Sequence, residues 1–230
     1  MNKSIKTLCV AGILASGIAC NNASNQNNNM EINTDAEKFS YSLGMDIGQN
    51  VKDSEFDSLQ VELLLNGIRD VINEGEPKFT LEESQQFVRD YLTKLQDQKS
   101  QANLDKGEQY LAENAKREGV VTLESGLQYE IMKEGNGPKP SATDQVKTHY
   151  HGTLIDGTVF DSSVDRGEPA TFPVNRVIPG WTEALQLMPV GSKWKLYIPS
   201  ELAYGERGTR GAIGPNETLI FEVELLEIVK

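Results

Sequence analysis

The stretch LIFEVELLEIV, residues 219–229, decides the fold class of the C-terminal half of this chain. Apolar and acidic residues alternate through it from Phe221 to Leu225, which is the two-residue period of a strand with one buried and one solvated face. Residues 127–133, 146–152 and 193–198 also have the composition and turn boundaries of strands. The pattern therefore predicts a largely antiparallel sheet.

One helix is expected among these strands, over residues 181–188. Asp156-Gly157 follows the strand at 146–152 and is a hairpin signal, which again favours antiparallel pairing. We therefore predict an α+β domain over residues 119–230, built from an antiparallel sheet and one short helix.

Conventional catalytic motifs are missing from this half. Ser162 and Ser163 do not lie in a G-x-S-x-G turn, the arrangement that exposes a serine nucleophile. His149 and His151 share one strand face, but no cysteine or third histidine completes a zinc site, so we expect local hydrogen bonds. The glycine-rich residues 205–214 lack the G-K-[ST] of a phosphate cradle. The sequence predicts neither a metal ion nor a cofactor.

Aromatic residues gather beside the turns of this domain. They are Tyr150, Phe160, Phe172, Trp181, Tyr204 and Phe221. Aromatic side chains in a small sheet usually form the core, and the same set can line an apolar pocket. Spacing alone leaves both interpretations open.

Four short motifs carry a resemblance to a known family. In chain order they are Val159-Phe160-Asp161-Ser162-Ser163, Val177-Ile178-Pro179-Gly180-Trp181, Ala203-Tyr204-Gly205 and Leu219-Ile220-Phe221-Glu222-Val223-Glu224-Leu225-Leu226. Over about residues 120–230 the chain resembles FKBP-type peptidyl-prolyl cis-trans isomerases. The resemblance implies an antiparallel sheet wrapped around one short helix, and rotation of X-Pro peptide bonds without a nucleophile or general base.

The same resemblance assigns pocket residues. Its catalytic positions match Tyr150, Phe160, Asp161, Ile178, Trp181, Tyr204 and Phe221, and its substrate-binding positions match Phe172, Val177 and Ile213. It implies that Trp181 forms the floor and that Asp161 is the polar group at the rim. The N–H of Ile178 and the hydroxyl of Tyr204 are expected to donate hydrogen bonds to the bound chain.

Two positions depart from the family pattern. Thr209 and Ala212 stand where small single-domain members commonly carry His and Ile, in the loop over residues 205–214. The departures bear on substrate preference and on affinity for the macrolide inhibitors of the family, which the resemblance implies as ligands.

The N-terminal half has helical periodicity instead. Thr34 and Glu37 form a capping box, and an apolar face follows at four-residue intervals. The residues of that face are Phe39, Leu43 and Ile47. A second amphipathic helix is predicted over residues 58–74, ended by Gly75 and Pro77.

A long helix is predicted over residues 80–118, opened by the capping box of Thr80 and Glu83. Apolar residues almost vanish between residues 96 and 109, so we expect this part to be a solvent-exposed strut. Gly107 is the position where such a strut would bend.

The apolar helical stripes call for a partner surface. A small number of helices can bury only a small part of their own apolar surface, so we expect a homodimer that pairs the stripes. Packing of the stripes on the second domain is the alternative. The stretch Phe39-Ser40-Tyr41-Ser42-Leu43-Gly44 and the long helix resemble the macrophage infectivity potentiator subgroup, whose members are V-shaped dimers joined by N-terminal helices. The expected domains are a dimerisation domain at 34–79, a connecting helix at 80–118 and the isomerase at 119–230.

The first residues form an export signal. Lys3 and Lys6 precede an apolar run at 8–18, and small residues then lead to Cys20. This end resembles a bacterial lipobox, so residues 1–19 are expected to be a lipoprotein signal peptide and Cys20 the lipidated residue, although an ordinary secretory signal remains the alternative. The Asn-rich residues 20–33 are expected to be a disordered tether. The expected location is the periplasm-facing cell envelope, at the outer membrane.

Charge bears on the partners. With 22 basic and 34 acidic side chains the net charge is -12, and no basic stripe offsets it, so nucleic acid is not an expected partner. The expected partners are unfolded, proline-containing polypeptides. The alternative to an isomerase is a chaperone that holds unfolded chains in the cleft of a dimer, with isomerisation dispensable.

Overall fold

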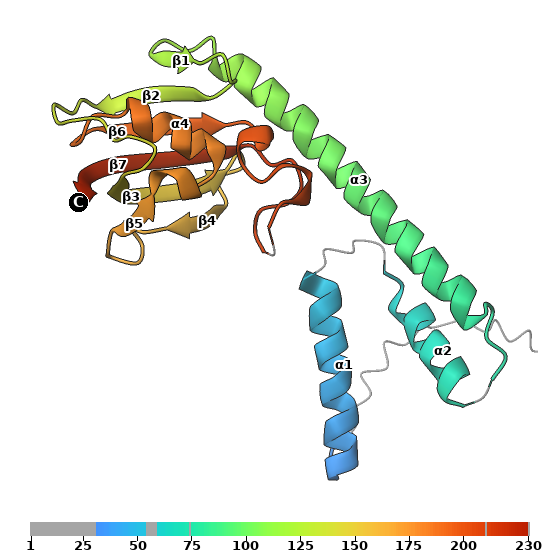
Figure 1. Cartoon of the computed structure of the whole chain (residues 1–230). Coiled ribbons are helices and arrows are strands. Elements are labelled where there is room, and N and C mark those ends of the chain that lie inside the picture. Colours follow the sequence, from blue (N-terminus) through green and yellow to red (C-terminus); the bar gives the residue numbers. More distant parts are fainter. Residues whose placement is uncertain (1–30, 54–58, 74, 210, 230) are drawn as a thin grey trace, which may run out of the picture. The chain divides into compact units, whose positions relative to one another are not determined.

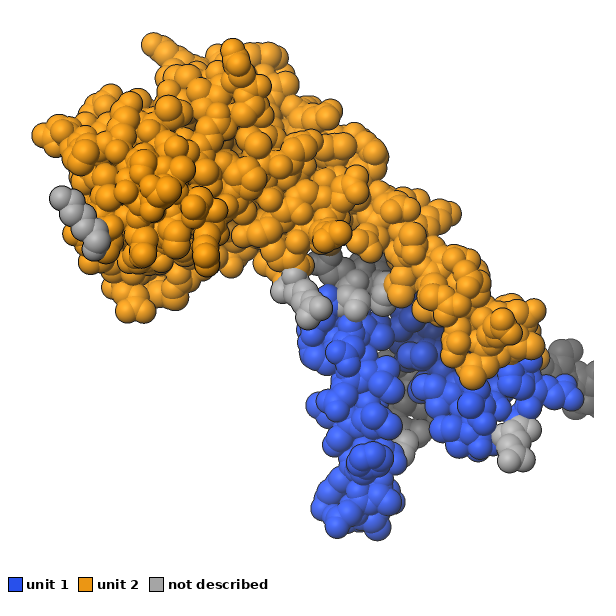
Figure 2. All heavy atoms as spheres, in the orientation of Figure 1, with its two compact units in different colours: residues 1–77 blue, residues 78–230 orange. Residues whose placement is uncertain are grey.

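A computed structural model describes residues 31–53, 59–73, 75–209 and 211–229. The signal peptide, Cys20 and most of the expected tether lie outside this range. Contacts divide the chain into two compact units, Met1–Pro77 and Lys78–Lys230, which are coloured blue and orange in Figure 2.

The first unit contains α1 (Asp35–Asp53) and α2 (Val61–Ile72). At the start of α1 the Glu37 N–H donates to Thr34 Oγ1 over 3.3 Å, while Glu37 Oε2 accepts from the Thr34 N–H over 2.8 Å. The predicted capping box is therefore present. No residue in either of these helices is buried, and most of their large apolar side chains are exposed.

The second unit contains α3 (Leu81–Asn114) and a seven-stranded antiparallel sheet. The strands are β1 (Val120–Thr122), β2 (Gln128–Lys133), β3 (Gln145–Leu154), β4 (Val159–Ser162), β5 (Ala170–Pro173), β6 (Lys193–Ile198) and β7 (Leu219–Val229). Their spatial order is β1-β2-β6-β7-β3-β4, with β5 also paired to β3. The stretch that opened the sequence argument, β7, is a central strand between β6 and β3.

A short helix covers one face of this sheet (Figure 1). It is α4 (Pro179–Leu187), and proline at its first position fits a helix start because no N–H is needed there. Trp181, Ala184 and Leu185 are buried from α4 into the core, together with Met188 just after it. The structure confirms the predicted α+β domain with one short α-helix beside the sheet.

The long helix differs from the expected strut. Its C-terminal half packs on the sheet domain: Asn114 Nδ2 donates to Gln128 Oε1 over 2.8 Å, and Gln128 Nε2 donates to the Leu111 carbonyl over 2.9 Å. Gly107 is buried against Thr218 rather than serving as a bend within a free rod. Most residues between 96 and 109 are exposed, as predicted, but the prediction was wrong for one face, where Ser100, Asn103 and Gly107 contact the sheet domain. Hydrophobic periodicity does not register contacts made by polar and small residues.

Candidate active site

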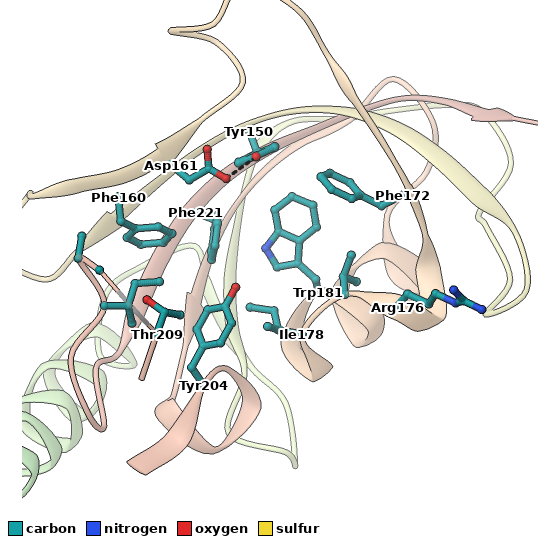
Figure 3. Close-up of a pocket in the computed structure, with 14 residues that line it drawn as sticks. Tyr150, Phe160, Asp161, Phe172, Arg176, Ile178, Trp181, Tyr204, Thr209 and Phe221 are labelled. Atoms are coloured by element: carbon teal, nitrogen blue, oxygen red, sulfur yellow. Dashed lines mark hydrogen bonds between the residues drawn. The ribbon is translucent and has the colours of Figure 1, made fainter. Parts of the chain in front are cut away.

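A cavity of about 770 Å³ opens beside α4. Figure 3 shows the side chains that line it. The structure brings together the ten pocket residues predicted from the sequence: Tyr150, Phe160, Asp161, Phe172, Val177, Ile178, Trp181, Tyr204, Ile213 and Phe221. Cys20, the expected lipidation site, lies outside the described residues.

Trp181 lies at the centre of an aromatic cluster. Its ring meets those of Tyr150, Phe172 and Phe221 edge to face, with centroids 5.4, 5.9 and 5.2 Å apart. Phe160 stands edge to face with Phe221 at 5.3 Å and extends the cluster. Each ring comes from a different element, so the sheet and α4 together fix the cluster, and edge-to-face contacts of this kind are favourable. The result is an apolar floor with little freedom to rearrange.

Polar groups form one rim of the pocket. The Tyr150 hydroxyl donates to Asp161 Oδ2 over 2.5 Å and accepts from Arg166 Nη2 over 2.8 Å. Arg166 Nη1 also donates to Asp161 Oδ1, which closes a three-residue network. Burial opposes ionisation of Asp161, but the hydrogen bonds from Tyr150 and Arg166 outweigh it and lower the pKa of this carboxyl. Asp161 is therefore an ionised, oriented carboxylate at neutral pH.

Arg166→Met is expected to raise the pKa of Asp161, because the substitution removes a hydrogen bond and a positive charge while burial remains. A carboxyl group whose pKa is lowered by folding stabilises the folded state at pH values above its unfolded-state pKa. This stabilisation is lost as pH falls through its folded-state pKa. The variant should therefore lose less stability than the wild type across that acid range. NMR titration of the Asp161 carboxyl carbon and acid unfolding measure the two effects.

Arg176→Met is the matched control, since Arg176 also lines the pocket. Its removal should leave the Asp161 titration unchanged. An Asp161 titration identical in wild type and Arg166→Met would contradict the network.

Two residues that line the pocket carry a hydrogen-bond donor without a partner among the described residues. One is the N–H of Ile178, the residue that caps α4 and whose carbonyl accepts from the N–H groups of Trp181 and Thr182. The other is the Tyr204 hydroxyl, which Figure 3 shows directed into the cavity. Burial and the nearby Asp161 charge raise the pKa of Tyr204, so its hydroxyl keeps its proton.

The described residues of the glycine-rich loop, 205–209 and 211–214, include another wall of the pocket. Thr209, Gly211, Ala212 and Ile213 line the cavity, so both positions that depart from the family pattern face it. The Thr209 N–H donates to the Ile213 carbonyl over 2.8 Å and closes the tip of the loop.

Sequence reasoning missed two arginines at this site. Arg166 follows β4 in a turn and reaches back to Asp161 and Tyr150, and Arg176 lies in a 3₁₀ turn before α4. Neither belongs to a motif or a periodic pattern, so only the folded chain identifies them.

The two histidines of β3 make local contacts. His149 Nδ1 lies 3.2 Å from Ser163 Oγ, and His151 Nδ1 lies 3.0 Å from Ser162 Oγ. Within the described ranges, no group of three or more His, Cys, Asp or Glu residues is placed to hold a metal ion. No helix in the part that the structure describes is long and apolar enough to cross a membrane.

Comparisons with known proteins agree with this geometry. Residues 137–226 match the family model of FKBP-type peptidyl-prolyl cis-trans isomerases, and residues 36–131 match that of the domain amino terminal to them. An FKBP-type 22 kDa peptidyl-prolyl cis-trans isomerase of Escherichia coli is 52% identical over 193 residues, covering 83% of this chain and 94% of that relative. The outer membrane protein MIP of Legionella longbeachae is 43% identical over 221 residues, which cover 93% of this chain and 94% of that relative.

Solved structures also match. The crystal structure of FkpA from Escherichia coli superposes with a TM-score of 0.66 at 36% identity, covering 86% of this chain and 98% of that one. The similarity therefore extends over both the helical and the sheet regions.

Proposed function

This chain belongs to the family of FKBP-type peptidyl-prolyl cis-trans isomerases and is a peptidyl-prolyl isomerase; from this premise we propose that the pocket around Trp181 is where it rotates X-Pro bonds. The observation that carries the proposal is the aromatic floor, closed on one side by the Tyr150–Asp161–Arg166 network. We call that network the rim triad.

The chemistry needs no nucleophile. Amide resonance sets a barrier of about 18–20 kcal/mol to rotation, and X-Pro bonds rotate unaided over tens to hundreds of seconds. Twisting the bond removes the resonance and leaves a less polar amide, which an apolar pocket holds better than the planar ground state. Acceleration by about a million-fold needs about 8 kcal/mol of this differential stabilisation. Desolvation on the aromatic floor, with a few hydrogen bonds, is of that order.

The polar groups hold the chain while the bond twists. The Ile178 N–H and the Tyr204 hydroxyl donate to carbonyl groups of the bound peptide, which fixes the segment on each side of the proline. Asp161 holds the Tyr150 hydroxyl and the Arg166 guanidinium in place, which keeps the rim rigid. Asp161 therefore contributes by positioning and by its charge, without accepting a proton.

Protease-coupled cis–trans kinetics on an Xaa-Phe-Pro peptide tests this function. The purified protein should accelerate isomerisation, and Asp161→Asn should lower kcat/KM by about three- to tenfold, since one charged hydrogen-bond partner of the rim triad is replaced by a neutral one. Unchanged kinetics in Asp161→Asn would remove Asp161 from the mechanism. Absence of any acceleration by folded wild-type protein would instead favour a chaperone that holds unfolded chains.

We further propose that the protein is a homodimer through its N-terminal helices. Apolar side chains on α1 and α2 are exposed: Phe39, Leu43, Met45, Val61, Leu63, Val71 and Ile72. A soluble protein rarely leaves so many apolar side chains in water, and a second copy of the same unit would cover them. Light scattering on the purified protein without its signal peptide should give twice the mass of one such chain. A single species at the chain mass would contradict the dimer.

The export signal supports a location in the cell envelope. We propose that Cys20 is lipidated, that residues 21–33 tether the folded units to the periplasmic side of the outer membrane, and that proline-containing exported proteins are the clients. Mass spectrometry of the membrane-extracted protein should find a diacyl- or triacyl-modified N-terminal Cys20. An unmodified N-terminus in the soluble fraction would contradict the anchor.

A further inference from the structure

The docked half of α3 presents a polar face to the sheet domain. Asn103 Nδ2 donates to the Pro215 carbonyl over 2.8 Å, and Ser100 Oγ accepts from Asn216 Nδ2 over 2.8 Å. Gly107, two turns beyond Ser100, is buried against Thr218. Residues at positions 100, 103 and 107 lie on one face of a helix because it has 3.6 residues per turn. This face of α3 therefore contacts Pro215, Asn216 and Thr218.

Residues 215 and 216 are the base of the loop that walls the active site. We call residues 205–209 and 211–214, the described residues of this loop, the pocket loop, and it contributes Thr209, Gly211, Ala212 and Ile213 to the cavity lining. The Asn216 N–H donates to the Gly205 carbonyl over 2.9 Å, which joins the two ends of the loop. At Gly214, an added Cβ would lie 3.4 Å from Asn103 Nδ2 and 3.6 Å from Lys99 Cε, so α3 directly borders the loop.

Asn216 has an unusual backbone conformation at this junction. Its φ of 53° is in the left-handed region, where no other non-glycine described residue lies. Asparagine tolerates this region better than most residues but at some cost, so the surrounding contacts must hold it there. The contacts include the bond from its side chain to Ser100, the bond from its own N–H to Gly205 and a 3.5 Å contact from Ser200 Oγ to Asn216 Oδ1.

We propose that Asn103 and Asn216 are positioning residues of the isomerase, which anchor the pocket loop to α3 so that the helix sets how tightly the pocket holds a proline-containing chain. The proposal rests on the proposed function of this pocket. Both side chains lie at the base of the pocket loop and do not line the cavity themselves. When either hydrogen bond is lost, the loop samples more conformations and its wall of the pocket is less often in place, so binding weakens while chemistry on the Trp181 floor continues.

Two variants of the purified full chain test the anchors. Asn103→Ala removes one donor. Asn216→Gly removes the other while keeping a residue that adopts positive φ without strain. Each should raise KM for an Xaa-Phe-Pro peptide by about three- to tenfold, the effect of one lost hydrogen bond, and leave kcat within about twofold.

Gln98→Ala is the matched control. Gln98 is an exposed amide on α3, five residues from Asn103 and therefore on the opposite face of the helix. It should leave KM and kcat as in the wild type.

The split between KM and kcat separates positioning from plain stabilisation. A purely structural role would lower the melting temperature of both variants while KM, measured well below melting, stayed at the wild-type value; that result would overturn the proposal. An equal fall in kcat and kcat/KM at unchanged KM would overturn it too. Failure of the proposed function is distinct, since wild-type protein would then show no acceleration at all.

Discussion

Replacing Trp181 by alanine is expected to lower kcat/KM for an Xaa-Phe-Pro peptide by about 100-fold or more, which corresponds to about 2.7 kcal/mol of lost transition-state stabilisation. Trp181 lines the pocket and contacts three of its other aromatic rings. Without the indole, water fills the space where the amide twists. The pocket then no longer favours the less polar twisted state over the planar one.

Loss of activity in this variant could also reflect unfolding, because Trp181 is only 4% exposed. Truncation of a buried tryptophan to alanine costs about 3–5 kcal/mol, a large part of the 5–15 kcal/mol that stabilises a typical domain. The chain offers a matched control in Trp194 of β6, which is also 4% exposed but stacks on Tyr129 at 4.3 Å and lines no part of the cavity.

Trp194→Ala should therefore lose a similar amount of stability and keep its kinetics close to wild type. Thermal melts establish the folded fraction, and the kinetics are measured by protease coupling at about 10 °C. If both variants lost activity in parallel with their folded fractions, the role assigned to the Trp181 floor would be wrong. If Trp181→Ala kept wild-type kinetics, catalysis would not use this pocket.

Much of the aromatic part of the site could be predicted from the sequence because Phe160, Trp181, Tyr204 and Phe221 belong to the short motifs that carry the family resemblance. Asp161 is next to Phe160 in one motif, and Ile178 is three residues before Trp181 in another. Strand pairing places a further residue of the site. β3 and β4 are antiparallel neighbours in which Gly152 pairs with Asp161, and this pairing brings Tyr150 close to Asp161. Local sequence and strand pairing therefore carry most of the pocket.

Arg166 could not be found in the same way. It donates to residues 5 and 16 positions earlier, from a turn whose course is not encoded in any repeat. The short strands β1, β4 and β5 were also missed, because 3 or 4 residues are too few to display a two-residue period. The longer strands β6 and β7 were predicted with their observed bounds.

The docking of the C-terminal half of α3 on the sheet domain could not be predicted from the sequence for a different reason. Hydrophobic periodicity reports where apolar side chains are buried, and the face of α3 that contacts the sheet domain includes Ser100, Asn103 and Gly107. Hydrogen bonds and close backbone approach make this interface. A polar helix can therefore be docked over half its length while its sequence resembles that of a free one.

Gly107→Ala tests that docking, and its expected sign is opposite to that of helix propensity. In an exposed helix this substitution stabilises by about 0.5–1 kcal/mol. Here an added Cβ would lie 2.3 Å from Thr218 Oγ1, and Thr218 is 2% exposed, so its side chain has little room to move. Overpacking of this kind costs about 1–3 kcal/mol, so the variant should unfold at lower denaturant concentration and its α3 amides should exchange faster near residue 107.

Thr218→Ala provides the rescue that identifies the cause. It removes the Oγ1 atom at 2.3 Å and leaves the Thr218 Cβ at 3.4 Å from the new methyl group, a tight but tolerable contact. The double variant should therefore recover most of the stability lost in Gly107→Ala, with a coupling energy of about 1–2 kcal/mol in the double-mutant cycle. If Gly107→Ala alone were more stable than the wild type, α3 would stand clear of the sheet domain in solution. The docked helix, and with it the anchoring of the pocket loop, would then have to be abandoned.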